Sequence, residues 1–234
     1  MPRPPGHGSG FEPRRQEIIS ISASLFARRG YAATGITDIC RAVGLARGAL
    51  YYYIGSKENL LVEIQAAVLG PLLAVARRIV EAPASPAVRL RLLSEVLLDI
   101  IFQRLDHIWV YEHDYRQLSA RNREVVVAQR HEFEAIVIDL LAAAVGEGQF
   151  RPMDLQLGML QFLNLHNHTY QWARPGDEKW PVAHLAAEYC GTLFRGFASA
   201  DFDPSGIEAQ VGRFRSEHPE LDFTPDLSGA AAPA

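Results

Sequence analysis

Histidine and carboxylate side chains gather in one short stretch of the chain. Imidazole nitrogens and carboxylate oxygens are common ligands of transition metals, and the same residue types serve as general acids and bases. The cluster consists of His107, Glu112, His113 and Asp114. Its competing interpretation is a set of solvated or pocket-lining side chains. No nucleophile–histidine–acid spacing and no glycine-rich phosphate loop accompanies it, so we expect neither a metal, nor a cofactor, nor enzyme activity. A metal-binding sensor or small-molecule enzyme is the alternative hypothesis.

A second set of side chains combines aromatic rings with a few polar ends, which is the usual composition of a small-molecule pocket. An aromatic stripe at helical spacing is equally typical of a protein core, so this interpretation depends on the whole set. Arg174 either pairs with an anionic group of the ligand or is the cation at the end of a helix. The predicted ligand-binding residues are Trp109, Tyr111, His113, Phe162, His166, Tyr170, Trp172 and Arg174.

Two short helical patterns surround one tight turn between residues 34 and 53. Ile36, Ile39 and Val43 form one apolar face, and Gly44 follows where a helix end favours positive φ. The next pattern runs from about Ala46 to Ile54. Two short helices joined by such a turn form a helix-turn-helix, whose second helix enters the DNA major groove. An ordinary helical hairpin is the alternative.

The distribution of charge favours the DNA-binding interpretation. The chain has 234 residues and a net charge of −4. Residues 13–60 contain seven cations and three acids, whereas residues 201–234 contain two cations and seven acids. A basic segment on an otherwise acidic chain is the electrostatic footprint of a DNA-binding head, although a solvated basic face would look the same.

Within this head, Arg47 stands near the start of the second helix and is the best candidate for contact with a base edge or a phosphate. Successive tyrosines face different directions on a helix, so Tyr51 should pack inside while its two neighbours face the DNA. Thr37 and Lys57 suit phosphate contacts. The predicted DNA-binding residues are Gly35, Thr37, Ala46, Arg47, Gly48, Tyr52, Tyr53 and Lys57.

Apolar residues recur at helical spacing along most of the chain, and no alternating pattern long enough for a strand interrupts them. We therefore predict an all-α protein with a three-helix head and a larger helical domain. Residues 107–118 look irregular, and Gly70-Pro71 should kink or end the helix around it. The predicted helices are 14–29, 36–43, 46–54, 57–80, 87–105, 121–145, 153–172, 181–198 and 206–216.

Composition divides the chain into four segments. We expect a disordered leader (1–12), a DNA-binding domain (13–58), a ligand-binding and dimerisation domain (59–200) and a largely disordered acidic tail (201–234). We expect no signal peptide or membrane-spanning helix, because charges interrupt each apolar run. The two cysteines, Cys40 and Cys190, are too few for a disulfide framework and fit a reducing cytoplasm.

The head resembles the DNA-binding domain of the TetR family of bacterial repressors over about 45 consecutive residues. The matching residues are Leu25-Phe26, Gly30-Tyr31, Thr34, Ile36, Ile39, Ala42-Val43-Gly44, Gly48, Leu50-Tyr51, Tyr53, Ser56-Lys57-Glu58 and Leu60. The resemblance implies a helical homodimer that binds a palindromic operator and releases it when a small-molecule inducer binds. Three residues depart from the family pattern: Gly35 and Ala46 stand where hydroxyl residues are common, and Ile54 replaces a phenylalanine.

A second segment, residues 167–176, resembles the Asn-Trp-Thr…Trp-Tyr-x-Pro-x-Gly motif in a branch of that family. This branch responds to acyl-CoA thioesters and includes repressors of fatty-acid and steroid catabolism. His168 and Ala173 replace two aromatic residues of the motif. The resemblance implies an acyl-CoA inducer. The two replaced residues bear on which acyl-CoA it is.

Together these features predict a ligand-responsive repressor that dimerises through helices near 153–172 and 181–198. Dimerisation would set the separation of two recognition helices on duplex DNA. Besides the metal-sensor or enzyme hypothesis, an adaptor that keeps the fold but binds protein instead of DNA is a further alternative. Steep salt dependence of DNA affinity would distinguish the repressor from the adaptor.

Overall fold

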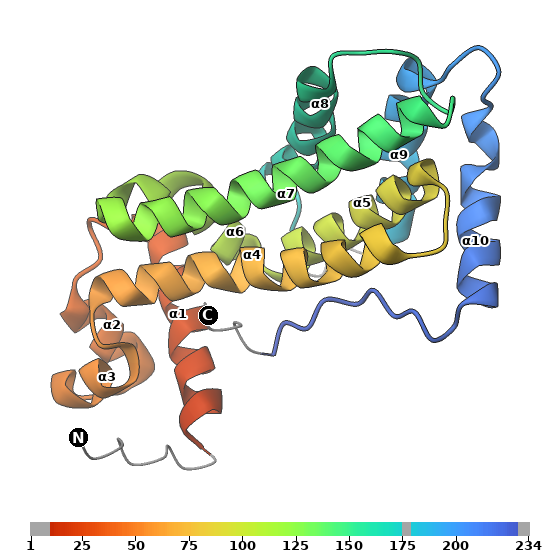
Figure 1. Cartoon of the computed structure of the whole chain (residues 1–234). Helices are drawn as coiled ribbons and strands as arrows, with labels where there is room; N and C mark the ends of the chain where they lie inside the picture. Colours follow the sequence, from red (N-terminus) through yellow and green to blue (C-terminus); the bar gives the residue numbers. More distant parts are fainter. Residues whose placement is uncertain (1–9, 175–178, 229–234) are drawn as a thin grey trace, which may run out of the picture. The chain divides into compact units, whose positions relative to one another are not determined.

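The computed structural model describes residues 10–174 and 179–228, and their regular structure is helical (Figure 1). One isolated antiparallel bridge, between Phe150 and Ala198, is the exception to this pattern in the described ranges. The all-α prediction is confirmed. The helices are α1 (Phe11–Arg29), α2 (Ile36–Val43), α3 (Arg47–Ile54), α4 (Lys57–Glu81), α5 (Pro86–Gln103), α6 (Leu105–Asp114), η1 (Tyr115–Gln117), α7 (Ala120–Gly146), α8 (Leu155–Asn167), η2 (His168–Gln171), α9 (Val182–Phe197), η3 (Pro204–Gly206) and α10 (Ile207–Glu217).

The chain forms two compact units, which are described separately. Unit 1 contains the described residues up to Gly70, residues 106–127 and the described residues from Asp226 onward. Unit 2 contains residues 71–105 and the described residues between 128 and 225. Helices α4 and α7 each contribute to both units. The domain limits that composition suggests stay a prediction, because the units divide the chain at other positions.

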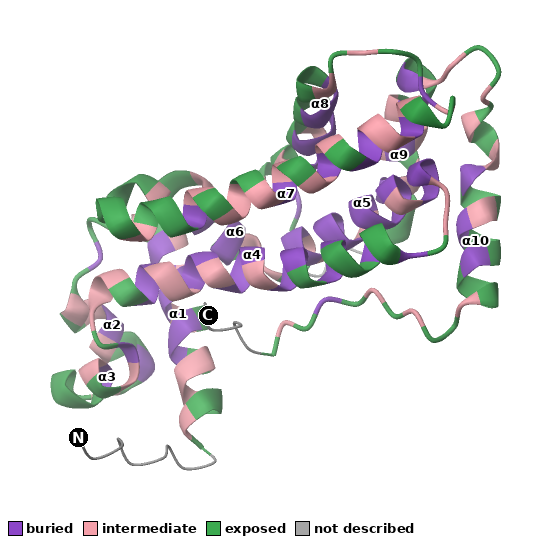
Figure 2. Cartoon of the chain, viewed as in Figure 1, coloured by how far each residue is buried: buried purple, intermediate pink, exposed green. Residues whose placement is uncertain are grey.

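The core of unit 1 is made by the apolar faces of its short helices. Ile18 and Phe26 of α1, Ile39 of α2, Leu50 of α3 and Leu60 of α4 are completely buried (Figure 2). Burying a side chain of this size contributes about 1.5–3 kcal/mol. The helix-turn-helix is therefore held by shared burial, which orients α3 relative to α1.

Gly44 ends α2 with a φ of +68°, the left-handed conformation that glycine adopts without a steric penalty. A Cβ added there would have open space around it, so the cost of Gly44→Ala comes from the backbone conformation. We expect Gly44→Ala to lower the free energy of unfolding by about 1–2 kcal/mol in urea denaturation. Gly48→Ala is the matched control, because Gly48 lies inside α3 in open space; it should raise stability by up to about 1 kcal/mol. Equal effects of the two substitutions would contradict this account.

Unit 2 is organised around α5, which packs against α8, α9 and α10. Thirteen of the eighteen α5 residues are buried. Leu98 of α5 forms a core cluster with Leu185 and Ala186 of α9, and Phe102 and Tyr189 pack against its edge. Burial on several sides leaves few α5 residues exposed to solvent.

Two helix predictions need correction, and the helix around Pro71 is as long as predicted. Residues 107–118 are not irregular, because α6 continues through Asp114 and η1 follows directly. The predicted helix 57–80 is confirmed as α4, which runs through Pro71 with buried Leu69, Leu72 and Leu73 on both sides of it. The predicted helix 153–172 is shorter than expected, since α8 ends at Asn167 and tightens into η2.

The ends of the chain are more ordered than their composition suggests. Helix α1 starts at Phe11, inside the expected leader, whose residues 1–9 lie outside the described ranges. The expected helix at 206–216 is present as α10, anchored by buried Ile207, Val211 and Phe214. Pro225 is buried too. A largely disordered tail stays a prediction, and residues 229–234 lie outside the described ranges.

Helix α4 is long and apolar enough to cross a membrane by composition. However, 67% of its most apolar stretch is buried inside the protein, which is the property of a core helix.

Candidate DNA-binding surface and ligand site

The helix-turn-helix presents most of the predicted DNA-binding residues to solvent. At the start of α2, the Gly35 N–H donates to Asp38 Oδ2 at 2.9 Å. At its end, Arg14 Nη2 donates to the Val43 carbonyl at 2.6 Å and satisfies a free helix acceptor. The exposed members of the predicted set are Gly35, Thr37, Ala46, Arg47, Gly48 and Tyr52, whereas Tyr53 and Lys57 are half-buried.

Arg47 is the first residue of α3, and its guanidinium lies 5.8 Å from the centre of the Tyr51 ring. The preceding Ala46 has no side chain that could cap the helix, so the first N–H groups of α3 are open to an external acceptor. A cation beside free N–H groups suits a phosphate or the acceptor edge of a guanine. Tyr51 is only half-buried, so the expectation that it packs inside holds in part.

The two following tyrosines contact a residue that sequence reasoning missed. Phe11 stacks on Tyr53 with ring centres 5.0 Å apart and meets Tyr52 edge-on at 5.4 Å. Tyr52 is nevertheless 61% exposed, whereas Tyr53 is held against α1. Phe11 belongs to the first turn of α1, and its position in a proline- and glycine-rich stretch concealed it in the sequence.

Lys57 has partners inside unit 1 instead of facing solvent. Its ammonium donates to the Tyr31 carbonyl at 2.6 Å and lies 4.0 Å from the centre of the Tyr31 ring. The Tyr31 N–H donates to Asp114 Oδ2 at 3.2 Å. Burial lowers the pKa of Lys57 and raises the pKa of Asp114. Lys57 thus has an internal acceptor within the head, and its contact with a DNA phosphate stays a prediction.

A second contact fastens the start of α4 to the start of α7. The Glu58 carboxylate accepts hydrogen bonds from the Ser119 N–H at 2.9 Å and from Asn122 Nδ2 at 2.7 Å. These hydrogen bonds hold the pKa of Glu58 below its ordinary value. In unit 1 the head is therefore joined to both α6 and α7 by polar contacts.

The histidine–carboxylate cluster does not converge on one point. His113 Nδ1 donates to the Trp109 carbonyl at 2.9 Å, and its ring stacks on Trp109 with centres 4.2 Å apart. His107 is buried, and Asp114 binds the head. In the described part of the chain no group of three histidine, cysteine or carboxylate side chains is arranged to hold a metal ion.

The predicted ligand-binding residues fall into both units. Unit 1 contains Trp109, Tyr111 and His113, of which Tyr111 is buried and the other two are exposed. The remaining five belong to unit 2: Phe162 and His166 are buried, Tyr170 is half-buried, and Trp172 and Arg174 are exposed. Pro175 and Gly176 of the second resemblance lie outside the described residues.

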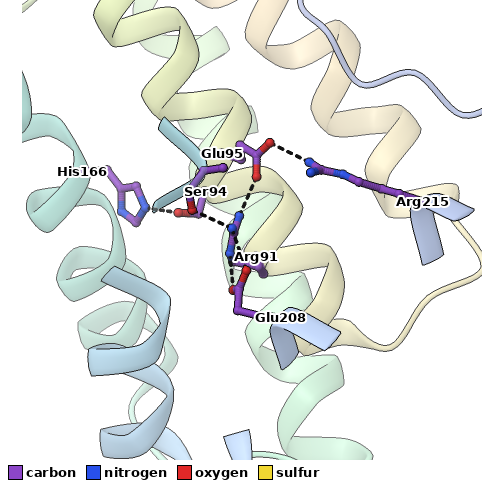
Figure 3. Close-up of polar contacts among 7 residues, drawn as sticks. Arg91, Ser94, Glu95, His166, Glu208 and Arg215 are labelled. Carbon is purple, nitrogen blue, oxygen red and sulfur yellow. Dashed lines mark hydrogen bonds and ion pairs between the residues drawn. The ribbon is translucent and has the colours of Figure 1, made fainter. Parts of the chain in front are cut away.

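His166 is part of a buried polar group in unit 2 (Figure 3). Its Nδ1 donates to the Phe162 carbonyl at 2.7 Å, which leaves Nε2 to accept from Ser94 Oγ at 2.6 Å. Ser94 also shares a hydrogen bond with Cys190. Burial lowers the pKa of His166 to about 4 and raises the pKa of Cys190 to about 12. Both groups are thus uncharged at neutral pH, and both ring nitrogens of His166 have a partner inside the protein.

Arg91 forms an ion-pair network beside this group, and its side chain is only 2% exposed (Figure 3). It donates to both Glu208 oxygens at 2.6 and 3.0 Å, to Glu95 Oε2 at 2.8 Å and to the Ala183 carbonyl at 2.9 Å. Arg215 donates to the other Glu95 oxygen at 2.6 Å. The network joins α5, α9 and α10. An arginine in an apolar helix pattern was the one sequence signal for it.

Two family models match the chain. Residues 18–64 match the tetR family of bacterial regulatory proteins, and residues 83–197 match the tetracyclin repressor-like C-terminal domain. The chain is 30% identical to the HTH-type transcriptional repressor KstR2 of Rhodococcus jostii over 200 residues, which cover 85% of this chain and 98% of that protein.

Solved structures agree with the sequence comparison. The ketosteroid transcriptional regulator KstR2 of Mycobacterium tuberculosis superposes with a TM-score of 0.74 at 27% identity, covering 80% of this chain and 95% of that one. AibR in complex with isovaleryl coenzyme A and operator DNA has the same fold, with a TM-score of 0.69 at 24% identity over 77% of this chain and 98% of that one. With its helix-turn-helix and its match to a named repressor along most of its length, the chain belongs to the TetR family of DNA-binding transcriptional repressors.

Proposed function

We propose that the protein binds a pseudo-palindromic operator as a homodimer in the cytoplasm and releases it when a small molecule binds. The observation that carries this proposal is the exposed start of α3, where Arg47 stands beside uncapped N–H groups. Burial of Leu50 and Ile39 beneath this surface makes the orientation of α3 rigid. A rigid recognition helix can reproduce one register on DNA.

Helices α8 and α9 supply the proposed dimer contact. Leu157 and Leu160 of α8 are 57% and 45% exposed, which is unusual for leucines in a well-packed helix. On α9, Ala187 and Gly191 are four residues apart, and a Cβ at Gly191 would meet open space. A partner helix could therefore approach closely. Pairing here would set the two recognition helices about 34–36 Å apart, or at a multiple of that distance.

An acyl-CoA thioester is the proposed inducer. Its support is the resemblance of residues 167–174 to the acyl-CoA-responsive branch, together with the similarity to KstR2, a ketosteroid regulator. In unit 2, half-buried Tyr170 supplies apolar surface, and exposed Arg174 offers a cation for a phosphate.

Contacts within unit 1 suggest how a ligand would act on the head. Helix α6 carries the predicted ligand residues Trp109 and His113, and its last residue, Asp114, holds Tyr31. Tyr31 in turn binds Lys57 at the start of α4. A ligand that favours a different position of α6 would weaken these contacts. The population would then shift away from the DNA-binding state.

The first test of the proposal is Arg47→Ala. Loss of a base contact should weaken operator binding by about 1–3 kcal/mol, measured by mobility shift or fluorescence anisotropy at fixed salt. Arg28→Ala is the matched control, since it removes an equal charge from an exposed position at the end of α1. If both variants lost affinity equally, or neither did, Arg47 would not belong to the DNA-reading surface.

A thermal-shift panel tests the inducer. An acyl-CoA that binds the native protein should stabilise it by about 2.7 kcal/mol at a hundredfold excess over Kd, and should also release operator DNA. Free coenzyme A and the free acid are the controls for each half of the ligand. Failure of every thioester to shift the melting temperature would exclude this ligand class while leaving the DNA-binding proposal intact.

A further inference from the structure

A cavity of about 840 Å³ lies in unit 2, between one face of α5 and the segment that ends α10 and follows it. This volume is within the range of small-molecule pockets, about 300–1,000 Å³. Leu92, Val96 and Asp99 belong to its α5 wall, and residues 215–225 supply most of the opposite wall. None of the eight residues that the sequence predicts to bind the inducer lines it.

Defined contacts hold the outer wall in place. Arg215 is tied to Glu95 of α5 at 2.6 Å (Figure 3), and Arg78 donates to the Asp222 carbonyl. Phe223 stacks on Phe214 of α10 with ring centres 6.2 Å apart. The match to the family's C-terminal domain ends at residue 197, so this wall is built from a segment outside it.

Charged groups of both signs line the cavity: Glu95, Asp99 and Asp222, with Arg215 and His218. Glu95 is neutralised by Arg91 and Arg215, and the Asp222 carboxylate accepts from the Thr224 N–H at 2.8 Å. Asp99 is only partly exposed, yet it makes no ion pair or hydrogen bond with any residue that the structure describes. A carboxylate next to apolar walls gains most from a partner of opposite charge.

We propose that this cavity binds an organic cation with an apolar body. The body would lie against Leu92, Val96 and Phe223, and a protonated amine would pair with Asp99. Phe223 contributes apolar surface only, because its ring stacks on Phe214 and the Arg78 guanidinium lies 5.7 Å from its centre. None of the residues predicted to bind the inducer lines this cavity, so this site is separate from the proposed inducer site. It gives the acidic C-terminal segment a role in binding.

Three adamantane derivatives with the same body test the proposal: 1-aminoadamantane as the cation, 1-adamantanol as the neutral form and adamantane-1-carboxylate as the anion. We expect the full-length protein to bind the amine about tenfold more tightly than the alcohol in titration calorimetry, since a charge-assisted hydrogen bond is worth roughly this factor. The carboxylate should bind most weakly.

Asp99→Asn keeps the shape of the side chain but removes its charge, so it should abolish the preference for the amine while leaving alcohol binding unchanged. Asp201→Asn removes the same charge from an exposed position outside the cavity and should keep the preference. The proposal is overturned if the amine shows no binding at millimolar concentration, if the three compounds bind equally, or if Asp99→Asn keeps the preference. Operator binding by Asp99→Asn should equal that of the native protein, which separates this result from the DNA-binding proposal.

Discussion

Replacing His166 with glutamine should flatten the acid side of the protein's stability profile. The folded-state pKa of His166 is about 4, against 6.5 for the exposed side chain. Below pH 6.5 the unfolded chain therefore binds a proton that the folded chain excludes, and stability falls as pH decreases toward 4. At about 1.4 kcal/mol per pKa unit, the native protein should lose about 3 kcal/mol across this window. Below pH 4 this contribution to the slope ends.

The physical cause of the shift is burial. His166 is fully buried, its Nδ1–H is committed to the Phe162 carbonyl, and Nε2 accepts from Ser94, so protonation would place an unhydrated charge in the core and remove an acceptor. The positive charge of Arg91 disfavours protonation further. Glutamine does not bind a proton between pH 4 and 6.5. The substitution should therefore remove this part of the pH dependence even if it also changes the stability at neutral pH.

Urea denaturation at a series of pH values and one protein concentration measures the slope directly. His131→Gln, at an exposed position of α7, is the matched control and should leave the profile unchanged. Imidazole proton resonances should also show that His166 stays neutral until about pH 4. A native-like acid slope in His166→Gln would mean that other groups, such as the Glu95 carboxylate, cause the acid sensitivity.

Replacing Arg91 with methionine should destabilise unit 2 by about 3 kcal/mol, the effect of removing one partner of a buried ion pair. Methionine fills part of the space but leaves the Ala183 carbonyl without this donor and takes one cation from Glu95. Glu208 is 50% exposed and can regain water, which limits the loss. Because Arg91 joins α5 to α10, we also expect faster proteolysis after residue 200.

An exposed ion pair of similar length is the appropriate control for Arg91. Arg77 lies 2.5 Å from Glu132, with side chains 59% and 42% exposed. Arg77→Met should cost less than about 1 kcal/mol, because water screens both charges. Chemical denaturation of both variants shows whether the loss of stability depends on the burial of the ion pair or on its length. Equal losses of unfolding free energy in the two variants would show that burial does not increase the contribution of the Arg91 network.

The two large effects concern the same part of the molecule. Ser94 and Arg91 lie three residues apart on α5, and between them they contact α8, α9 and α10. A buried hydrogen-bond network lowers stability when some of its polar atoms lack a partner. When every polar atom has a partner, the network favours one packing arrangement of the helices. We therefore expect α5 to set the relative positions of the helices proposed for dimerisation.

Much of the architecture follows from local sequence patterns. Apolar spacing located the helices, because a helix needs one buried face and its period of 3.6 residues is visible in the chain. Gly44 marked the turn because few other residues accept its backbone angles. Arg47, at the first position of α3, was recognised from its place in the motif.

The remaining features depend on contacts between residues far apart in the chain. Lys57 is predicted to contact a phosphate, and only the structure shows that the Tyr31 carbonyl, 26 positions earlier in the chain, accepts a hydrogen bond from it. His166 is predicted to line a ligand pocket, and only the structure shows that Ser94, on another helix, is hydrogen-bonded to its ring. A side chain's charge state and availability depend on burial and on its partners, and the tertiary fold brings those partners together. The sequence by itself therefore determined the helices, the turn and the family of this protein, whereas only the tertiary structure decided which of its polar groups face solvent and which hold the helices together.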